Sequence, residues 1–509
     1  MTTQLNHKQI STGRLWLLSF TLVLASFMVV VDMTIANVAL PHMMGTLGAT
    51  SEQITWVLTS YTIAEAIFIP LTAYFASRLG ERTLLMVSVS GFVIFSILCG
   101  QADSLDSMIA YRIAQGMMGA SIIPLTQSLM VRYFPSDKKN LAMAIWGIGI
   151  MMGPVVGPTL GGYITTYADW RWIFYVNVPI GLLALGLIWL LIEQTKRSIV
   201  KIDWIMIIFM ALGIGTLQAF LDQGNMHDWF ESTQIKILFL LSIIGFAVFI
   251  YRAWNDDNSV VPLRLLKDRN LLLSSLLMAI LSIALFGTVV IQPLMMEGLM
   301  GYPPDVAGLV MMPRGVAEAL GMMMAVVLTK YVNVRYVMLI GVTLSVTGSY
   351  MMTQLTLIVD QYALIMPSII QGAGIGMLFV PLSSLAYATL APEHATNAAA
   401  IFNLSRTIGS SMGISLASTI YTRSSQTQWN VLGSNITPYN PQVNEWLSSL
   451  NMTIEDPHAP QILANLLQQQ SSMVGFLDTF YFIMWCFIVI APVLFLIKSV
   501  KLDRKIELK

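Results

Sequence analysis

Long apolar segments recur along the whole chain of 509 residues and restrict its fold more than any other feature. A helix needs about 20 apolar residues to cross the core of a bilayer, and windows of that size give fourteen candidate spans. They begin near Leu15, Ile54, Leu84, Ser107, Leu141, Arg171, Asp203, Thr233, Leu271, Asp305, Val334, Tyr362, Thr396 and Gly475. Soluble proteins carry roughly 25% charged residues, whereas this chain carries 11% and is 56% hydrophobic. We therefore expect an all-α membrane protein with fourteen transmembrane helices.

The distribution of Lys and Arg tests this number of helices. With the N-terminus placed inside the cell, 21 of the 27 Lys and Arg residues fall on the inner side and 3 on the outer side. The remaining 3, which are Arg112, Arg314 and Arg406, lie within spans. Cytoplasmic loops of membrane proteins carry an excess of Lys and Arg. The distribution therefore predicts an even number of helices and places both termini in the cytoplasm.

The remaining composition argues against several classes of function. The formal net charge is zero, so no nucleic-acid partner is indicated. Cys99 and Cys486 both fall in apolar runs and indicate neither a disulfide framework nor a metal site. The five histidines do not cluster, and no phosphate-binding GxxxxGKS/T loop occurs. We therefore expect no metal and no cofactor, and the lack of a paired acid/base constellation argues against an enzyme.

A glycine-rich face marks the fifth span, Leu141 to Tyr163. Four glycines recur every fourth residue and therefore share one face of a helix: Gly149, Gly153, Gly157 and Gly161. Small residues at this spacing let another membrane helix approach closely. Pro154 and Pro158 remove backbone donors and bend or soften the helix. The face indicates either an ordinary packing helix or a tight, bendable contact between moving parts.

The chain also repeats part of its own sequence. Gln115-Gly116 and Pro124-Leu125-Thr126 recur as Gln371-Gly372 and Pro381-Leu382-Ser383. The second copy has its own face of small residues, at Gly409, Gly413 and Ala417. Two six-helix halves related in this way are typical of transporters built from parallel repeats. We expect one bundle in residues 1–200, two inserted helices in 201–256 and a second bundle in 257–509.

One long segment, 423–474, is expected outside the membrane. It is rich in Asn, Gln, Ser and Pro, and two short helical patterns occur in it, at Val443–Leu450 and Gln461–Leu467. A segment of this kind is either a solvated connector or a docking surface for an extracytoplasmic partner.

Ionisable residues inside membrane spans are costly, and each is a functional candidate by default. Asp32 lies about eight residues from the outer end of the first span, and Arg112 about five from the outer end of the fourth. At about 1.5 Å per residue these depths are similar, so the two side chains are expected to pair. Glu65 falls near the middle of the second span, with no obvious cation near it in the sequence.

Four further ionisable residues lie in or beside spans. Arg314 and Glu318 are four residues apart on one helix and are expected to neutralise each other. Asp222 and Glu297 lie near outer helix ends, where we expect solvation.

Several motifs together resemble those of the Major Facilitator Superfamily. Gly153-Pro154 resembles the core of its antiporter motif, VVVDMTIANVALP around Asp32 its first-helix signature, and YRIAQGMMGA around Arg112 its fourth-helix motif. DWRWIFYVNVPIG, at 169–181, is similar to the fourteen-helix drug:proton antiporters. LDQGNMHDWF, at 221–230, resembles the EmrB-type exporters.

The loop after the second span, AYFASRLGERT, resembles the cytoplasmic latch between the two halves of this family. Arg78, Gly80 and Arg82 match that motif. Ala73 stands in place of its glycine and Ser77 in place of its aspartate, so the latch loses a charged contact.

The resemblance implies a proton-driven exporter of hydrophobic or amphipathic compounds, with substrate bound between two rocking halves. Its proton-coupling candidates are Asp32, Glu65 and Arg112. Burial favours the neutral form of a carboxyl group and a nearby cation favours its ionised form, so a proton on Asp32 would free Arg112 and bias helix packing. A static structural salt bridge is the alternative. Candidates for substrate contact are Glu65, Asn37, Gln115, Glu318 and Arg314.

The resemblance also implies a location and partners. We expect the inner membrane of a Gram-negative bacterium, where a periplasmic membrane-fusion adaptor and an outer-membrane channel would complete a tripartite pump. A dedicated exporter of one metabolite, such as a siderophore or fatty acid, is the second hypothesis. A membrane-embedded enzyme or receptor is the third, and no constellation of residues supports it.

Overall fold

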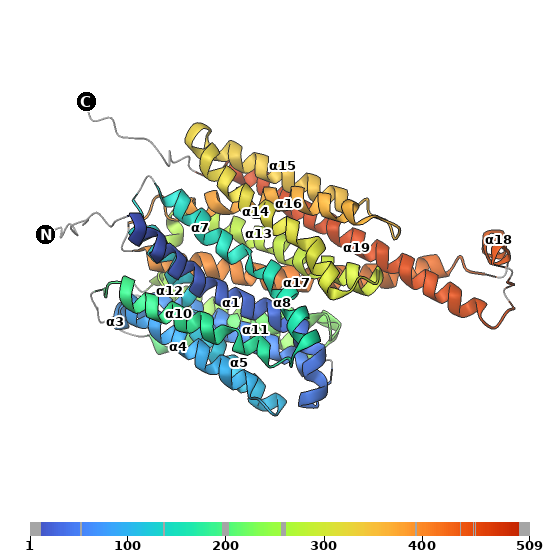
Figure 1. Ribbon diagram of the computed structural model, residues 1–509, viewed down its shortest axis with the longest axis horizontal. Coiled ribbons are helices and arrows are strands. Elements are labelled where there is room, and N and C mark those ends of the chain that lie inside the picture. Colours follow the sequence, from blue (N-terminus) through green and yellow to red (C-terminus); the bar gives the residue numbers. More distant parts are fainter. Residues whose placement is uncertain are drawn as a thin grey trace.

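The structure is a computed structural model, shown in Figure 1. It describes residues 12–50, 53–135, 138–195, 203–255, 261–391, 394–437, 439–450, 452–453 and 455–497. The boundaries expected between the bundles, at 200/201 and 256/257, lie outside the described residues.

Helices account for nearly all of the described chain, which contains no strand. The N-terminal group consists of α1 (Thr12–Leu47), α2 (Trp56–Phe68), α3 (Thr72–Leu79), α4 (Glu81–Gly100), α5 (Leu105–Gly119), α6 (Ile122–Tyr133), α7 (Lys139–Met151), α8 (Gly153–Tyr167), α9 (Trp172–Tyr175) and α10 (Asn177–Leu191). Two helices follow, α11 (Trp204–Gly224) and α12 (Thr233–Asn255). The C-terminal group consists of α13 (Arg269–Leu294), α14 (Pro304–Tyr331), α15 (Val334–Met352), α16 (Gln361–Leu385), α17 (Ala395–Gly433), α18 (Pro441–Ser449) and α19 (Ala459–Leu494). The expected all-α class is therefore confirmed.

Twelve helical segments of the described chain are long and apolar enough to cross a membrane, two fewer than the windows gave. The other two expected spans correspond to α5 with α6 and to α17. The first is interrupted between Gly119 and Ile122, so neither helix is long enough by itself. The second has 39 residues but carries many Asn, Ser and Thr side chains. Both nevertheless pack within the bundle, because α5 lies against α2 and α4, and α17 lies against α13 and α19.

The helices run roughly along one common direction, so the bundle has two ends (Figure 1). We call the end at which α1 begins and α19 finishes the near end, and the end from which α18 projects the far end. The helix α11 packs against α2 of the N-terminal group and against α17 of the C-terminal group, while α12 covers α11. The inserted pair therefore bridges both groups instead of standing apart from them.

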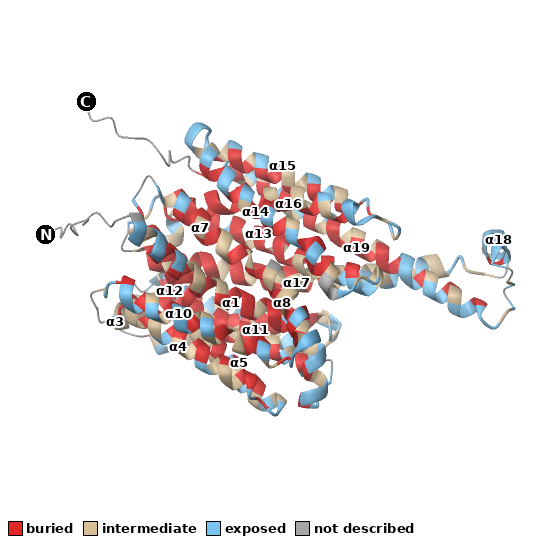
Figure 2. Ribbon diagram, viewed as in Figure 1, coloured by how far each residue is buried: buried red, intermediate tan, exposed pale blue. Residues whose placement is uncertain are grey.

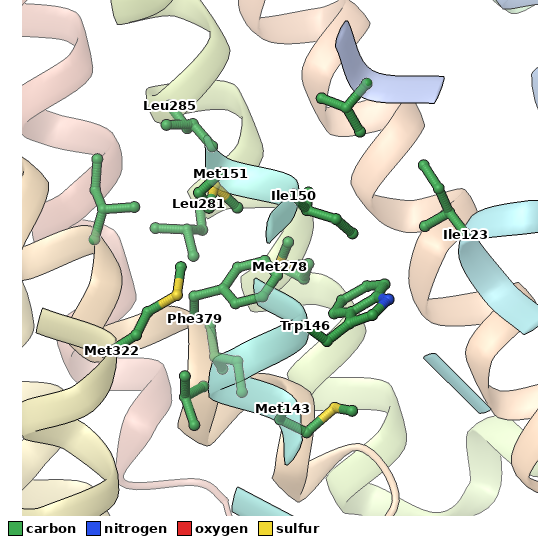
Figure 3. Packing of buried hydrophobic residues seen from close by; sticks show 14 of the residues in the cluster. Ile123, Met143, Trp146, Ile150, Met151, Met278, Leu281, Leu285, Met322 and Phe379 are labelled. Carbon is green, nitrogen blue, oxygen red and sulfur yellow. The ribbon is translucent and has the colours of Figure 1, made fainter. Parts of the chain in front are cut away.

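The interface between the two groups is apolar over much of its length. Trp146 of α7 stacks on Phe379 of α16, with their ring centroids 6.3 Å apart, and Met322 of α14 lies beside them (Figure 3). Buried residues fill the inside of the bundle (Figure 2). Large apolar side chains such as Trp189 and Leu240 are exposed on its outside, as expected for helices that face lipid.

An arm of helices extends beyond the far end of the bundle (Figure 1). It consists of the last turns of α17, the short helix α18 and the first turns of α19, and a small core of Leu447, Ala459 and Leu463 holds it together. The two short helical patterns expected in segment 423–474 are confirmed, although the second forms the start of the long helix α19.

Candidate functional site

The centre of the N-terminal group holds an ion pair between Asp32 of α1 and Arg112 of α5. Arg112 Nη1 lies 2.7 Å from Asp32 Oδ2, and both side chains are 0% exposed. The pair expected from the depths of the two residues is therefore formed. Each of these two charges, which have no access to water, needs the other as its partner. Removing one partner from a buried ion pair lowers protein stability by about 3–5 kcal/mol.

Two amide side chains complete the shell around Asp32. Gln115 donates from Nε2 to Asp32 Oδ1 at 3.0 Å and accepts from Arg112 at 2.8 Å. Asn177 of α10 donates from Nδ2 to Asp32 Oδ1 at 2.6 Å and to Ser96 Oγ of α4 at 2.9 Å. The carboxylate of Asp32 thus ties four helices together. Sequence reasoning missed the role of Asn177, although a polar residue in the apolar run of the 169–181 motif was a usable signal.

The Arg112 guanidinium has one nitrogen without a hydrogen-bond partner among the described residues. Its Nε donates to the backbone oxygen of Val57 at 3.1 Å, and its central carbon lies 4.3 Å from the ring centroid of Tyr61, a cation–π contact. Its Nη2 is buried without a hydrogen-bond partner among the described residues. A buried charged donor without a partner is costly, so this nitrogen is available to an acceptor that enters the site.

Glu65 has a cation near it that the sequence did not reveal. It lies on α2 and is 4% exposed, and the charge that acts on it most strongly is Arg406 of α17. Glu65 and Arg406, both among the described residues, form no direct ion pair. Arg406 donates from Nε to Asn403 at 3.3 Å, and Asn403 donates to Gln127 of α6. The buried acid thus lies on α2 of the N-terminal group and the cation that acts on it on α17 of the C-terminal group. The position of Arg406 within a span was the available signal.

Two other candidates for substrate contact form a pair within one helix. Arg314 Nε lies 3.2 Å from Glu318 Oε1 on α14, and both side chains are buried. This is the mutual neutralisation expected from their spacing. They pack against Gly372 of α16, where a Cβ would lie 2.7 Å from the backbone oxygen of Arg314. Asn37 is exposed on α1 and lies outside the Asp32 network.

The glycine face of the antiporter motif packs against α1. A Cβ on Gly153 would lie 2.5 Å from the side chain of Val30, and one on Gly157 would overlap Thr34. Gly149 and Gly161 meet α1 in the same way. The helix is interrupted at Met152, two residues before Pro154, and divides into α7 and α8.

This glycine face therefore packs inside the N-terminal group, and a neighbouring face of the same helices meets the C-terminal group. Gly147 lies against Phe379 and Met322, and Thr159 lies against Gly308 of α14. The sequence suggested a contact between moving parts at the glycine face. A contact between the two groups is present on α7 and α8, but it lies on the side with Gly147 and Thr159 and not on the glycine face.

Two of the three latch residues, Arg78 and Arg82, form hydrogen bonds within the N-terminal group. Arg78 donates to the hydroxyl of Tyr74 at 2.6 Å, and Arg82 donates to the backbone oxygen of Trp189 at 2.6 Å. Gly80 has a φ of 84°, a left-handed conformation that favours glycine.

A different acid at the near end joins the two groups. Glu81 pairs with Arg132 of α6 and accepts from Thr396, in the first turn of α17, at 3.3 Å. Ser128 shares a second hydrogen bond with Thr396 at 3.0 Å. A charged contact therefore exists here despite Ser77, and the sequence did not predict it.

Of the two carboxylates expected in solvent, only Glu297 is exposed. Asp222 of α11 is half-buried instead. The side chains of Thr59 and Thr62, both on α2, lie beside it, and Gln218 of α11 donates to it at 3.5 Å. The expectation for Asp222 was wrong because α2 packs against the far end of α11, a contact that span assignment cannot show.

Comparisons with known proteins fit this architecture. The sequence model of the Major Facilitator Superfamily matches residues 22–414. The chain is 34% identical over 487 residues to the multidrug export protein EmrB of Haemophilus influenzae, with 93% of each chain covered. It is 33% identical to the fatty acid resistance protein FarB of Neisseria gonorrhoeae, with 94% of this chain and 95% of that protein covered.

The fold is also similar to that of solved transporters. The human organic anion transporter MFSD10 aligns with a TM-score of 0.60 at 12% identity, over 93% of this chain and 99% of that chain. The chain belongs to the Major Facilitator Superfamily and, within it, to the family of EmrB-type multidrug export proteins.

Proposed function

We propose that this protein is a proton-coupled exporter of hydrophobic and amphipathic compounds that works by alternating access. The observation that carries the proposal is the Asp32–Arg112 pair, which is 0% exposed and joins helices of the N-terminal group. Relatives named multidrug export proteins support the substrate class. An inward proton yields about 2.3 kcal/mol per 100 mV of membrane potential, which is enough to bias two packing arrangements of similar energy.

Protonation of Asp32 is the coupling step in this proposal. The two oxygens of its carboxylate accept from Arg112, Gln115 and Asn177. A neutral carboxyl group loses the charge that holds Arg112 and gains a hydrogen that needs an acceptor of its own. Helices α1, α5 and α10 would then repack, and the glycine contact between α1 and α8 allows close sliding.

The two halves that rock would be residues 1–200 and 257–509, with residues 201–256 as an inserted pair. Substrate would bind between them, where Glu65 and Arg406 face each other. Glu65 would balance a cationic substrate. Gln115 and Asn37 on one side and Arg314 and Glu318 on the other are the remaining candidates for substrate contact. Arg314 has two buried guanidinium nitrogens without partners among the described residues, which suits an acceptor group on the substrate.

The near end would carry the cytoplasmic latch. Arg78, Gly80 and Arg82 shape the loop, while Glu81, Arg132 and Thr396 provide the contact between the halves. In the structure these hydrogen bonds hold the near end together, and export would require them to break once in each cycle.

We place the protein in a bacterial inner membrane with both termini in the cytoplasm, because 21 Lys and Arg residues lie on one side and 3 on the other. The far-end arm then projects into the periplasm. A groove of about 520 Å³ beside Trp429, Ile436 and Leu463 on this arm would contact a membrane-fusion adaptor, which an outer-membrane channel would follow. Deleting α18 is expected to abolish resistance in cells but to leave transport by the purified protein intact.

A dedicated exporter of one metabolite is the second candidate, and the 33% identity to a fatty acid resistance protein is the observation that favours it. Competition between chemically unrelated compounds separates the two candidates, because a dedicated exporter is inhibited by a narrow chemical class only.

The deciding experiment is substrate-induced proton movement in vesicles that contain only the purified protein. An exporter of this type releases protons to the side from which it takes the compound, and the rate saturates with compound concentration. Vesicles with Asp32→Asn protein provide the matched control. Transport without any proton movement would overturn the coupling, and a lack of transport for a broad compound panel would overturn the substrate class.

A further inference from the structure

The inserted helix α11 carries a carboxyl group, that of Asp222, which lies where α2, α11 and α17 meet. The Asp222 carboxyl group lies beside the hydroxyls of Thr59 and Thr62 on α2 and accepts from Nε2 of Gln218 at 3.5 Å. The same Gln218 nitrogen donates to Ser411 of α17. Asp222 therefore touches the N-terminal group directly and the C-terminal group through one amide.

Among the described residues, no cation holds the charge of Asp222. The groups that act on it are two hydroxyls and an amide. The titratable and charged residues on the helices packed against α11 are Tyr61 and Glu65 on α2, Glu231 on the 3-10 helix Trp229–Glu231, Lys236, Tyr251 and Arg252 on α12, and Arg406, Tyr421 and Arg423 on α17. None of these is among the groups acting on Asp222. Asp32, in contrast, is tied to Arg112, so Asp222 can take up a proton without breaking an ion pair.

The hydroxyl of Thr62 suits both protonation states of Asp222. It donates to the backbone oxygen of Thr59 at 3.0 Å, accepts from Nε2 of Gln218 at 3.5 Å and lies beside Asp222, and it has a single hydrogen. When Asp222 is ionised, that hydrogen points to the carboxylate. When Asp222 is neutral, the acid donates to Thr62 Oγ1 and the hydroxyl hydrogen turns to the backbone oxygen. Neither state leaves a donor of this cluster unused.

The row of polar groups on α2 leads from the far end towards the centre. Thr59, Thr62 and Glu65 are spaced by three residues and share one face of the helix. Each step descends by about 4.5 Å, at about 1.5 Å per residue. Asp222 is half-buried near the far end of α11, and Glu65 is buried one step below Thr62.

We infer that Asp222 is a second proton-binding residue, which takes protons from the far side and passes them along Thr62 to Glu65. In this transfer the Thr62 hydroxyl first turns its hydrogen from the backbone oxygen of Thr59 to one water molecule that bridges to Glu65. The O–H bond on Asp222 then breaks as its proton moves to Thr62 Oγ1, the original Thr62 O–H bond breaks as its hydrogen moves to the water, and the water gives one of its own protons to the Glu65 carboxylate. Asp222 ends ionised and Glu65 ends neutral. The inference rests on the proposed proton coupling and gives the inserted helix a place in it.

The first test measures protonation and needs no substrate. Infrared difference spectra of the purified full-length protein in lipid, recorded through a pH titration, follow the C=O stretch of each protonated carboxyl group. Asp222→Asn is expected to remove one titrating band that Glu65→Gln leaves in place. Thr62→Val should shift the Asp222 band, and Thr62→Ser should restore it. A full set of bands in Asp222→Asn would overturn the inference.

The second test measures coupling, with ethidium as the probe. Ethidium export driven by an inward proton gradient should slow about 100-fold in Asp222→Asn, the lower end of what a positioned proton-transfer group contributes. Ethidium exchange without a gradient should match the wild type. Glu297→Gln, which changes an exposed carboxylate near the far end of the C-terminal group, is the matched control and should retain both rates.

The outcomes separate this inference from the proposed function. Equal loss of driven export and exchange in Asp222→Asn would indicate a structural role and contradict the inference. Wild-type rates of Asp222→Asn in both assays would also contradict the inference but would leave coupling through Asp32 untouched. If the wild-type protein moved ethidium without moving protons, the proposed function itself would be wrong.

Discussion

The N-terminal and C-terminal groups share a backbone plan but differ in where they keep their charges. Gly157 of α8 meets Thr34 of α1, and Gly413 of α17 meets Ile283 of α13. Two residues before these contacts, Asp32 in the first group corresponds to Leu281 in the second. The small residues that set helix distances are kept in both groups, whereas the acid occurs in one.

The polar surroundings of Asp32 have a neutral counterpart in the C-terminal group. Gln371, the repeat partner of Gln115, donates to Ser349 Oγ at 2.8 Å. Ser349 takes the place that Ser96 has in the N-terminal group. Amide and hydroxyl groups therefore remain where the ion pair is absent.

Glu65 and Glu318 are also counterparts, because the runs Ala64-Glu65-Ala66 and Ala317-Glu318-Ala319 lie in register. Gly116 meets the backbone of Tyr61, and Gly372 meets the backbone of Arg314, four residues before each acid. Glu318 is neutralised on its own helix by Arg314, while Glu65 faces a cation on another helix. Only an interaction that crosses between helices converts a change of protonation into a change of packing, so the N-terminal group is the one suited to coupling.

The largest effect is expected from Asp32→Asn. The variant removes the charge while keeping the shape, so proton-driven export should fall by about 100-fold or more. Transport is measured in vesicles under an inward proton gradient, and membrane insertion is checked by the amount of folded protein. Glu297→Gln serves as control. Export at the wild-type rate in Asp32→Asn would mean that the ion pair is only structural.

Gly157→Leu should come next, with a fall in transport of at least about tenfold. A side chain at Gly157 would overlap Thr34, and overpacking costs about 1–3 kcal/mol or more, which would hold α8 away from α1. Gly186→Leu on α10 is the matched control, because a Cβ there meets nothing within 4 Å. Similar transport rates in the two variants would show that close contact at this face is not needed for the cycle.

Glu65→Gln should affect cationic substrates more than neutral ones. Loss of a charge-assisted contact costs about 1.5–3 kcal/mol, so export of cations should fall by about tenfold or more. The rates are compared for a cationic and a neutral compound of similar size. Glu297→Gln, which changes an exposed carboxylate, is the control and should leave both rates unchanged. Equal losses for both compounds would leave Glu65 with a structural role only.

The smallest effect concerns stability, and it compares the two small-residue faces. A Cβ at Gly413 would strike the backbone of Ile283, whereas one at Gly149 would strike the side chain of Val23. A side chain moves aside more easily than a helix backbone. Gly413→Ala should therefore cost about 1–3 kcal/mol and Gly149→Ala less than about 1 kcal/mol. Thermal unfolding in detergent measures the loss of stability in both variants. A larger loss in Gly149→Ala than in Gly413→Ala would contradict the difference drawn here between a backbone contact and a side-chain contact.

Much of the architecture was predictable because it depends on local sequence. A membrane span needs about 20 apolar residues, so hydropathy located the long helices, although the polar content of α17 and the interruption after Gly119 hid how those two spans are built. The spacing of Gly149, Gly153 and Gly157 predicted a close helix contact without showing that its partner is α1. Depth from the helix ends was sufficient to pair Asp32 with Arg112, since both positions follow from residue counting.

What the sequence by itself determined was the class of fold, the repeat and the set of buried charges. Tertiary structure alone decided which groups meet: Arg406 faces Glu65 and Glu81 reaches Thr396, across 341 and 315 residues of chain. It also placed Asp222 against Thr59 and Thr62. The physical reason is that hydropathy and helix spacing act along one segment, whereas the partner of a charge is fixed by which helices pack side by side. That packing depends on the whole bundle.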